Sequence, residues 1–261
     1  MPLPSLEERI SEPKARLRFP DAKVLRQLVE GLGKLLEEAR FTIREDGVHV
    51  VGMDPGKMAL MEVHMPREAF LEYEVQGEVE MGLNLESFIN IVKRGRKGDT
   101  VLLLVSDDKV LIRIDAGTIK RYLLPNIEVV SEIPGELKLE HDVEASVISD
   151  VIQKAVKDAE IVSNTLIIEA EDDTLKFKAR GEGTRSVEVR LTTESASLLY
   201  LNISNPATSA YDLQYLKNTL SIAKVAEAVD VKFSSDKPLE MVFKSPEGSR
   251  VRLFLAPVAL E

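Results

Sequence analysis

The sequence predicts an α+β protein built from two similar halves, each with antiparallel sheets and helices on one face. Two observations lead to this class. The chain repeats itself, and within each repeat a helical periodicity alternates with hairpin-forming strands. Short hairpins outnumber the long crossovers that parallel sheets need, so antiparallel pairing is expected. With 261 residues, each half has enough chain to bury a core of its own.

The internal repeat is clearest in the closing strands of each half. VLLLVSDDKVLIRI in the first half recurs as VDVKFSSDKPLEMVF in the second. The same shift places LNLESFINIV over AYDLQYLKNTL, with Leu85 matching Leu213. Upstream, an apolar pattern that starts at Val24 is matched to one that starts at Val147. These matches predict a duplicated domain.

Each half is expected to contain two helices separated by strands. Apolar residues at i, i+1, i+4, i+5 and i+8 predict amphipathic helices over 22–39 and 145–157. The alternating runs FTIREDGVHVVGM and TLIIEAEDDTLKFKAR follow them, with Asp-Gly or Asp-Asp at the bend. A second helix is expected in LESFINIVKRG and in DLQYLKNTLSIAK, after which a last group of strands closes each half.

A proline-bounded segment separates the halves. Pro125 and Pro134 lack backbone donors and Gly135 permits a turn, so 125–136 is expected to be an extended linker. Its apolar residues, such as Ile127, predict that it rests on another surface. The expected organisation is an N-terminal extension over 1–14, a first domain over 15–124, the linker, and a second domain over 137–261.

Composition excludes several classes of function. The absence of cysteine rules out disulfides and thiolate chemistry. His49, His64 and His141 lack the spacing of metal ligands, so each is expected to be structural, and neither a metal nor another cofactor is expected. The chain has no nucleophile elbow and no dinucleotide-binding fingerprint, so no catalytic residue is predicted. No apolar run is long enough to span a membrane and the N-terminus lacks a signal-peptide core, which predicts an intracellular, cytoplasmic protein without membrane contact.

The stretch GMDPGKMALMEV permits more than one interpretation. Its glycines and lysine suggest a loop that holds phosphate, but the glycine spacing is wrong and Ala59 stands near the place where a hydroxyl is needed. Two alternatives remain open. The stretch is either an ordinary hairpin turn or a turn with an apolar flank that binds a partner.

Basic residues gather on the outward faces of the expected helices, against a net charge of −10 for the whole chain. Clustered lysines and arginines can neutralise phosphates without reading bases. Aromatic residues make up only 5% and do not interleave with these lysines, which favours duplex over single-stranded DNA. The residues expected to contact DNA are Arg26, Lys34, Lys93, Lys97, Lys154, Lys157 and Lys217.

Five stretches of the chain occur in a characteristic order and spacing: GVHVVGMDPGKMALMEV, GLNLESFINIVKRG, DLQYLKN, SSDKPLEMVF and LFLAP. In this the sequence resembles the archaeal members of the proliferating cell nuclear antigen family of DNA sliding clamps. The resemblance extends from about Ala15 to Pro257. It implies the DNA clamp fold, a closed ring of three subunits around duplex DNA, and no catalytic activity. It also implies loading by a clamp loader of the replication factor C type and tethering of DNA polymerase, flap endonuclease and DNA ligase at the nucleoid.

The resemblance further implies two contact surfaces on each subunit. Neighbouring subunits would join through edge strands around Arg113 to Ile119 of one copy and Arg185 to Val189 of the next, which would satisfy open edges. Client proteins would insert apolar anchors into a groove under the linker, where adaptable methionines suit several partners. The implied groove residues are Met53, Met58, Leu60, Ile133, Pro134, Pro238, Phe254, Ala256 and Pro257.

Three departures from the family pattern leave alternatives open. Residues 1–14 have no counterpart, the terminal LFLAPVALE has a single aromatic residue, and Ile119 stands where an aromatic residue is common. The altered edge is compatible with a homotrimer or with a heterotrimer of related subunits. The alternative function is therefore a subunit of a heteromeric clamp-like ring that mainly recruits repair enzymes. A DNA-modifying enzyme is disfavoured because no catalytic constellation is present.

Overall fold

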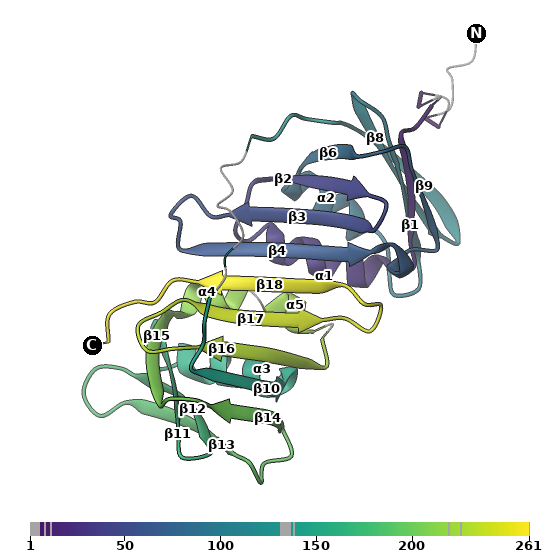
Figure 1. The fold of residues 1–261 in the computed structure, drawn as a ribbon. Coiled ribbons are helices and arrows are strands. Elements are labelled where there is room, and N and C mark those ends of the chain that lie inside the picture. The colour runs from purple at the N-terminus through teal and green to yellow at the C-terminus, as the bar shows by residue number, and fades with distance from the viewer. Residues whose placement is uncertain are drawn as a thin grey trace. The chain divides into compact units, whose positions relative to one another are not determined.

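Antiparallel sheets with helices on one face make up the chain (Figure 1), which confirms the predicted class. This computed structural model describes residues 6–7, 9–10, 12–130, 137, 139–218, 220–224 and 226–260. Its internal contacts divide the chain into two units. Unit 1 holds the described residues of Met1–Met53, Glu62–Ile133 and Glu247–Arg250, and unit 2 holds those of Asp54–Met61, Pro134–Pro246 and Val251–Glu261. Each unit therefore borrows a short segment from the other half of the sequence.

Unit 1 contains two sheets and two α-helices. One sheet has the order β5 (Glu72–Val75), β1 (Ala15–Phe19), β7 (Thr100–Val105), β8 (Lys109–Ala116) and β9 (Thr118–Pro125). The other joins part of β4 (Ala59–Pro66) to β3 (Gly47–Met53), β2 (Glu38–Arg44) and β6 (Val79–Asn84). The remaining elements are α1 (Ala22–Leu32), the 3-10 helix η1 (Arg67–Ala69) and α2 (Leu85–Val92).

Unit 2 repeats this plan. Strands β14 (Leu198–Ile203), β10 (Val143–Ile148), β16 (Ala228–Phe233), β17 (Leu239–Lys244) and β18 (Arg250–Leu255) are neighbours in one sheet. A second sheet has the order β13 (Ser186–Thr192), β12 (Thr174–Arg180), β11 (Thr165–Glu171) and β15 (Ala207–Asp212). Its helices are α3 (Ser149–Glu160), α4 (Leu213–Asn218) and α5 (Leu220–Ala223). No helix in the described part of the chain is long and apolar enough to cross a bilayer.

The duplication is confirmed, but the predicted match between its first helices is wrong by one helical turn. The buried positions of α1 recur in α3 at a shift of 127 residues, from Ala22 to Ser149, whereas the predicted match of Val24 with Val147 uses a shift of 123. Val147 and Ile148 belong to strand β10, so the helix predicted from residue 145 begins only at Ser149. The prediction failed because a strand runs directly into the helix, and apolar residues of the strand imitate one more helical turn.

The other predicted helices were also too long. Helix α1 begins where the side chain of Asp21 accepts hydrogen bonds from the backbone N–H groups of Lys23 and Val24 at 2.8 and 3.1 Å. It ends before Gly33, although apolar residues continue to residue 36, because strand β2 starts at Glu38. The helix predicted over 212–224 is divided into α4 and α5.

Glycines let α1 and α2 approach each other closely. A Cβ atom on Gly33 would lie 2.5 Å from the side chain of Ile89, and one on Gly95 would lie 2.5 Å from the Cβ of Ala22. The apolar faces of both helices are buried, with Leu25 and Phe88 at 3% and 1% exposure. The opposite faces are consequently left for polar residues.

Part of the N-terminal extension packs on unit 1. Ile10 is buried against Leu102, Leu104 and Leu111. One carboxylate oxygen of Glu7 accepts hydrogen bonds from Arg113 at 3.2 Å and from Arg121 at 2.8 Å. The described residues of this segment are therefore attached to strands β8 and β9.

The first residues of the linker are anchored on the edge strand β6. The side chain of Asn126 accepts a hydrogen bond from the N–H of Gly82 at 2.7 Å and donates to the carbonyl of Glu80 at 3.0 Å. The N–H of Ile127 donates to the carbonyl of Gly82 at 3.0 Å. The prediction that the linker rests on another surface is confirmed for these residues, while residues 131–136, including the groove candidates Ile133 and Pro134, lie outside the described residues.

Replacing Gly82 with alanine should release this anchor. Its Cβ would lie 1.9 Å from the carbonyl oxygen of Ile127, a backbone atom that can move only with the linker. We expect unit 1 to lose about 1–3 kcal/mol of stability in chemical denaturation, and we expect the amide of Ile127 to exchange hydrogen faster. Gly33→Ala is the control for hydrogen exchange at Ile127, because its Cβ meets the tip of Ile89 and leaves the linker untouched. Unchanged exchange at Ile127 in Gly82→Ala would contradict the anchor.

Candidate nucleic-acid interface and partner groove

The basic residues predicted to contact DNA all lie in or directly after helices. In unit 1, Arg26 projects from α1, and Lys93 follows α2. Glu30 lies between them, with its Oε1 3.8 Å from Arg26 Nε and 3.6 Å from Lys93 Nζ. Lys34 and Lys97 are in the loops that follow the two helices. One acid thus serves two basic side chains, and positive charge remains in excess on this face.

The helix layer of unit 2 is closer to neutral. Lys154 is paired with Asp150 at 2.7 Å, and this carboxylate raises the pKa of the lysine. Lys217 is paired with Glu160. Lys157 is exposed and lies next to Asp158 in sequence.

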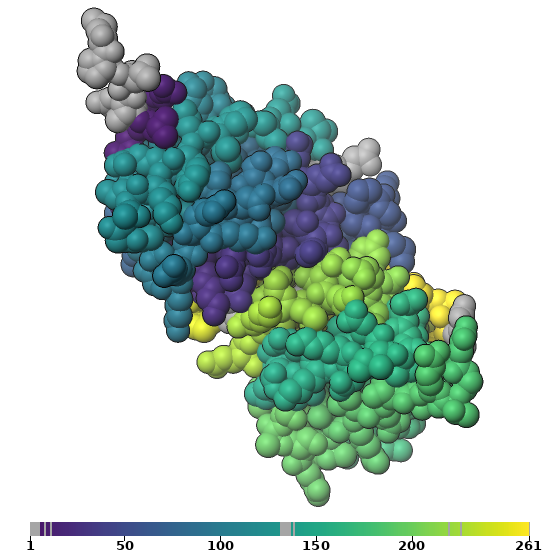
Figure 2. Space-filling model, turned by 180° about the vertical axis from the view of Figure 1, so that it is seen from behind, coloured from purple at the N-terminus to yellow at the C-terminus, as the bar shows by residue number. Residues whose placement is uncertain are grey.

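The two units therefore differ in charge although they share a fold. For unit 1 taken by itself, Figure 2 shows the surface of the side on which its helices lie. In unit 1 this layer carries more basic residues than the predicted set. The basic residues of its helices and following loops are Lys23, Arg26, Lys34, Lys93, Arg94, Arg96 and Lys97.

The sheet order shows which strands offer open edges. Strand β9 is the last in its sheet in unit 1, and its Ile119 is 50% exposed. Strand β13, which contains Val189 and follows Arg185, is the last in its sheet in unit 2. Arg113 lies on β8, between β7 and β9, so its backbone already faces a strand on each side. The edge expected around Arg113 to Ile119 is therefore confined to β9.

The turn in GMDPGKMALMEV is held by one buried carboxylate. Asp54 is 6% exposed and accepts hydrogen bonds from the N–H groups of Gly56 at 3.0 Å and Ala59 at 2.6 Å. It also accepts one from the hydroxyl of Tyr215 at 2.8 Å, and this hydrogen bond raises the pKa of Tyr215. Lys57 occupies the left-handed region with φ of 56°. Because every carboxylate contact goes to the protein's own groups, Asp54 organises the turn.

Backbone hydrogen bonds hold the C-terminal residues Ala256 to Val258 beside this turn in unit 2. The N–H of Ala256 donates to the carbonyl of Met58, and the N–H of Val258 donates to the carbonyl of Ala210, both at 2.8 Å. The next residue, Tyr211, donates its hydroxyl hydrogen to the carbonyl of Lys237 at 3.0 Å. Met58, Ala256, Pro257 and Pro238 thus belong to connected segments of one unit.

The predicted groove residues differ in accessibility. Met58, Pro238, Ala256 and Pro257 are half-buried and can contact a partner. Leu60 and Phe254 are only 5% and 3% exposed, so they lie beneath this surface. The guanidinium of Arg252 lies 4.9 Å from the ring centre of Phe254. Met53 is half-buried and belongs to unit 1.

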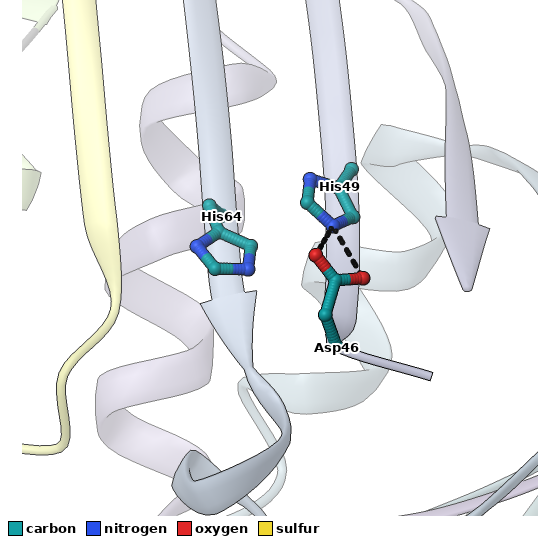
Figure 3. A group of neighbouring side chains, drawn as sticks. All are labelled: Asp46, His49 and His64. Carbon is teal, nitrogen blue, oxygen red and sulfur yellow. Dashed lines mark hydrogen bonds and ion pairs between the residues drawn. The ribbon is translucent and has the colours of Figure 1, made fainter. Parts of the chain in front are cut away.

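Sequence reasoning missed Tyr215 and a cluster of Asp46, His49 and His64 (Figure 3). The histidines were expected to be structural and to lack the spacing of metal ligands, yet the rings of His49 and His64 stack with centroids 4.4 Å apart. Counting from the turn could have found them, because His49 lies five residues before Asp54 and His64 five residues after Ala59, and these two turn residues are hydrogen-bonded. An unbroken hairpin register places such residues opposite each other.

The fold and both units match known proteins along nearly the whole chain. Residues 15–120 match the proliferating cell nuclear antigen N-terminal domain, and residues 137–258 match its C-terminal domain. The chain is 43% identical over 240 residues to DNA polymerase sliding clamp 1 of Aeropyrum pernix, covering 91% of this chain and 97% of the relative. The crystal structure of PCNA from Thermococcus kodakaraensis superposes with a TM-score of 0.87 and 26% identity, covering 94% of this chain and 100% of that one.

A PCNA from A. fulgidus, solved with the C-terminal region of FEN-1 bound, has the same fold, with a TM-score of 0.85 at 22% identity over 95% of this chain and 99% of that one. Together the two domains and their order define a DNA polymerase sliding clamp. The chain belongs to the proliferating cell nuclear antigen family.

Removing the carboxylate of Asp54 should disorganise the turn. Asp54→Ala leaves two backbone donors and the Tyr215 hydroxyl without their acceptor, so we expect a loss of roughly 3 kcal/mol in the free energy of unfolding. Tyr215→Phe removes only one of these bonds and should cost about 1 kcal/mol. Pro55→Ala, at an exposed position of the same turn, is the control. Equal stability of Asp54→Ala and this control in chemical denaturation would disprove the role of Asp54.

Proposed function

We propose that copies of this chain close into a three-membered ring around duplex DNA and tether DNA polymerase, flap endonuclease and DNA ligase to it. Membership of the sliding-clamp family carries the proposal. In this ring the chain has no catalytic role. A separate clamp loader of the replication factor C type opens the ring, and the chain supplies only closure, charge and docking surfaces.

Ring closure would use the two open edges. Strand β9 of one copy would extend the sheet that ends at β13 of the next, so Ile119 and Val189 would be covered together. Such pairing uses backbone groups that are otherwise a hazard for aggregation. Arg185 lies directly before β13. Arg113 lies on β8, one strand in from the edge, so it would contact a neighbouring subunit only through its side chain.

Duplex DNA would pass along the helix layers. A closed ring is held by linkage, so its basic residues need only weak, exchangeable phosphate contacts, which permit sliding. The excess of acidic residues elsewhere would repel DNA and confine it to the helix side. Because Lys154 and Lys217 of unit 2 are paired with acids, unit 1 would supply most of the attraction.

Clients would dock beside the turn that Asp54 holds. Met58, Pro238, Ala256 and Pro257 offer an apolar surface within unit 2, and Met53, Ile133 and Pro134 are proposed to extend it. Leu60 and Phe254 would form its floor, because both are buried. The flexible thioether of Met58 suits a surface that receives several clients.

The alternative is a heteromeric ring in which this chain mainly recruits repair enzymes. It is favoured by the aliphatic Ile119 at an exposed edge, where the family commonly has an aromatic residue. Mass measured by light scattering decides between them. A homotrimer of 29.0 kDa subunits gives about 87 kDa, whereas a persistent monomer would favour the heteromer.

The ring mechanism predicts that DNA topology controls retention. After loading, the clamp should remain on nicked circular DNA and leave the same DNA once it is linearised. Replacing Lys34, Lys93 and Lys97 together with alanine should weaken retention most at low salt. The slope of log affinity against log salt concentration should flatten by about 0.9 for each phosphate that is no longer neutralised. A matched triple variant of Arg40, Lys232 and Lys244, which lie on β2, β16 and β17, should retain the wild-type slope.

Retention on both DNA forms would refute topological linkage. An unchanged salt slope in the helix-layer variant would refute the electrostatic part alone.

Strand pairing predicts that a charge at either edge dissociates the oligomer. Ile119→Arg or Val189→Arg should lower the mass in light scattering from about 87 kDa to the 29.0 kDa of one subunit, because a charge would be buried between strands. Leu199→Arg is the control, since Leu199 is 55% exposed on β14, an edge that the ring does not use. Dissociation by Leu199→Arg, with both other variants intact, would place the interface elsewhere.

A further inference from the structure

The cluster of Asp46, His49 and His64 lies in unit 1 on the sheet face opposite its core. His49 on β3 alternates with the buried Val48 and Val50. His64 on β4 likewise stands next to buried residues on both sides. Both imidazoles therefore point away from the core, and Figure 3 shows them side by side with Asp46 next to His49. The helix layer lies on the other face, so the cluster is separate from the proposed DNA surface.

The three side chains bring their ligand atoms close together, and the two stacked imidazole rings must turn before both face one ion. Nε2 of His49 lies 3.1 Å from each carboxylate oxygen of Asp46. One ligand atom from each of the three residues lies within 4.8 Å of the others. A metal ion bound at about 2.0–2.2 Å holds its ligands about 3.3–3.6 Å apart in a tetrahedral site. Side-chain rotations that move these atoms by about 1 Å would therefore complete such a site.

One ring nitrogen in the cluster lacks a partner. In the described structure, Nε2 of His64 is buried and accepts or donates no hydrogen bond. Beside it lies Gly47, where an added Cβ would be 3.1 Å from this nitrogen and 2.3 Å from the carbonyl oxygen of Met65, so the backbone packs closely on this side of the ring. Burial and the neighbouring His49 lower the pKa of His64. The unpartnered nitrogen of a neutral imidazole can offer its lone pair to an ion.

We propose that Asp46, His49 and His64 bind a divalent transition-metal ion, for which Zn²⁺ is the appropriate probe. Two imidazoles and one carboxylate are the donor set of zinc and similar ions, whereas Mg²⁺ and Ca²⁺ favour sites made of oxygen alone. Water completes the coordination, because Asp46 and His49 are 64% and 28% exposed. Within the described residues, this is the one group of His, Asp and Glu side chains with such spacing.

A bound ion would connect the bend between β2 and β3 to strand β4. Asp46 belongs to that bend, and its carbonyl already accepts a hydrogen bond from the N–H of Arg67 at 3.0 Å. The ion would thus stabilise the native hairpin over the unfolded chain, in which the ligands are not assembled. Arg250 is the nearby cation whose charge acts on His64. It is exposed, so it weakens the site only partly.

Calorimetric titration of the full chain with ZnCl₂ tests the proposal. We expect one ion per chain, reversal by a chelator, and a rise of about 5 °C in the melting temperature of unit 1 at saturation. The imidazole signals of His49 and His64 should shift in NMR spectra. His141, which is hydrogen-bonded to Glu240 at 3.0 Å, is an internal control whose signal should not shift.

Variants separate this site from adventitious binding. His49→Gln and Asp46→Asn should each lower the affinity for Zn²⁺ by more than roughly 10- to 100-fold. That is the loss expected when a residue that only hydrogen-bonds to a metal ligand is removed, and these two residues are proposed as ligands themselves. Glu45→Gln removes the same charge from the same bend and should leave affinity unchanged, while Arg250→Ala should tighten binding. Circular dichroism checks that each variant is folded. Absence of binding by the wild type, or equal binding by Asp46→Asn and Glu45→Gln, would overturn the proposal.

Discussion

Burial of one face of each helix against the sheets is the interaction on which the rest of this structure depends. Leu25 and Phe88 are almost fully buried, and Gly33 and Gly95 bring α1 and α2 into close contact. The opposite face of each helix is then free of packing demands. It can carry any charge that function requires, because changes there cost little stability. A sliding surface for DNA can be built in this way without cost to the core.

The two units show how a duplicated fold can specialise. Their helices bury corresponding positions, yet unit 1 has an excess of basic residues around Glu30 where unit 2 has lysines held by Asp150 and Glu160. The shared fold determines which helix residues must be apolar because they face the sheets. The residues on the outward face of each helix can differ between the two units. Unit 2 instead carries the turn of Asp54 together with the C-terminal segment, so the excess of basic residues and the proposed docking surface belong to different copies of the same plan.

Periodicity was enough to predict the fold class, the duplication and the strand pairs β2–β3, β7–β8, β11–β12 and β16–β17, because each depends on a local pattern of burial. It failed at Val147 and Ile148, where strand and helix patterns overlap without a break. It also could not show that Leu60 is buried while Met58 remains accessible, since exposure depends on segments far away in the sequence. The stacked histidines were missed for a related reason. Their proximity follows from the register of one hairpin, which has to be counted from its turn.

The short segment before β1 changes what a neighbouring molecule meets at the edge of unit 1. The family domain begins at residue 15, but Glu7 and Ile10 lie against β8 and β9. Glu7 places a carboxylate against Arg113 of β8 and Arg121 of the edge strand β9, which lowers the net positive charge where a neighbour would approach. Electrostatic selection between related subunits at this edge would thus be set partly by residues outside the repeated domain.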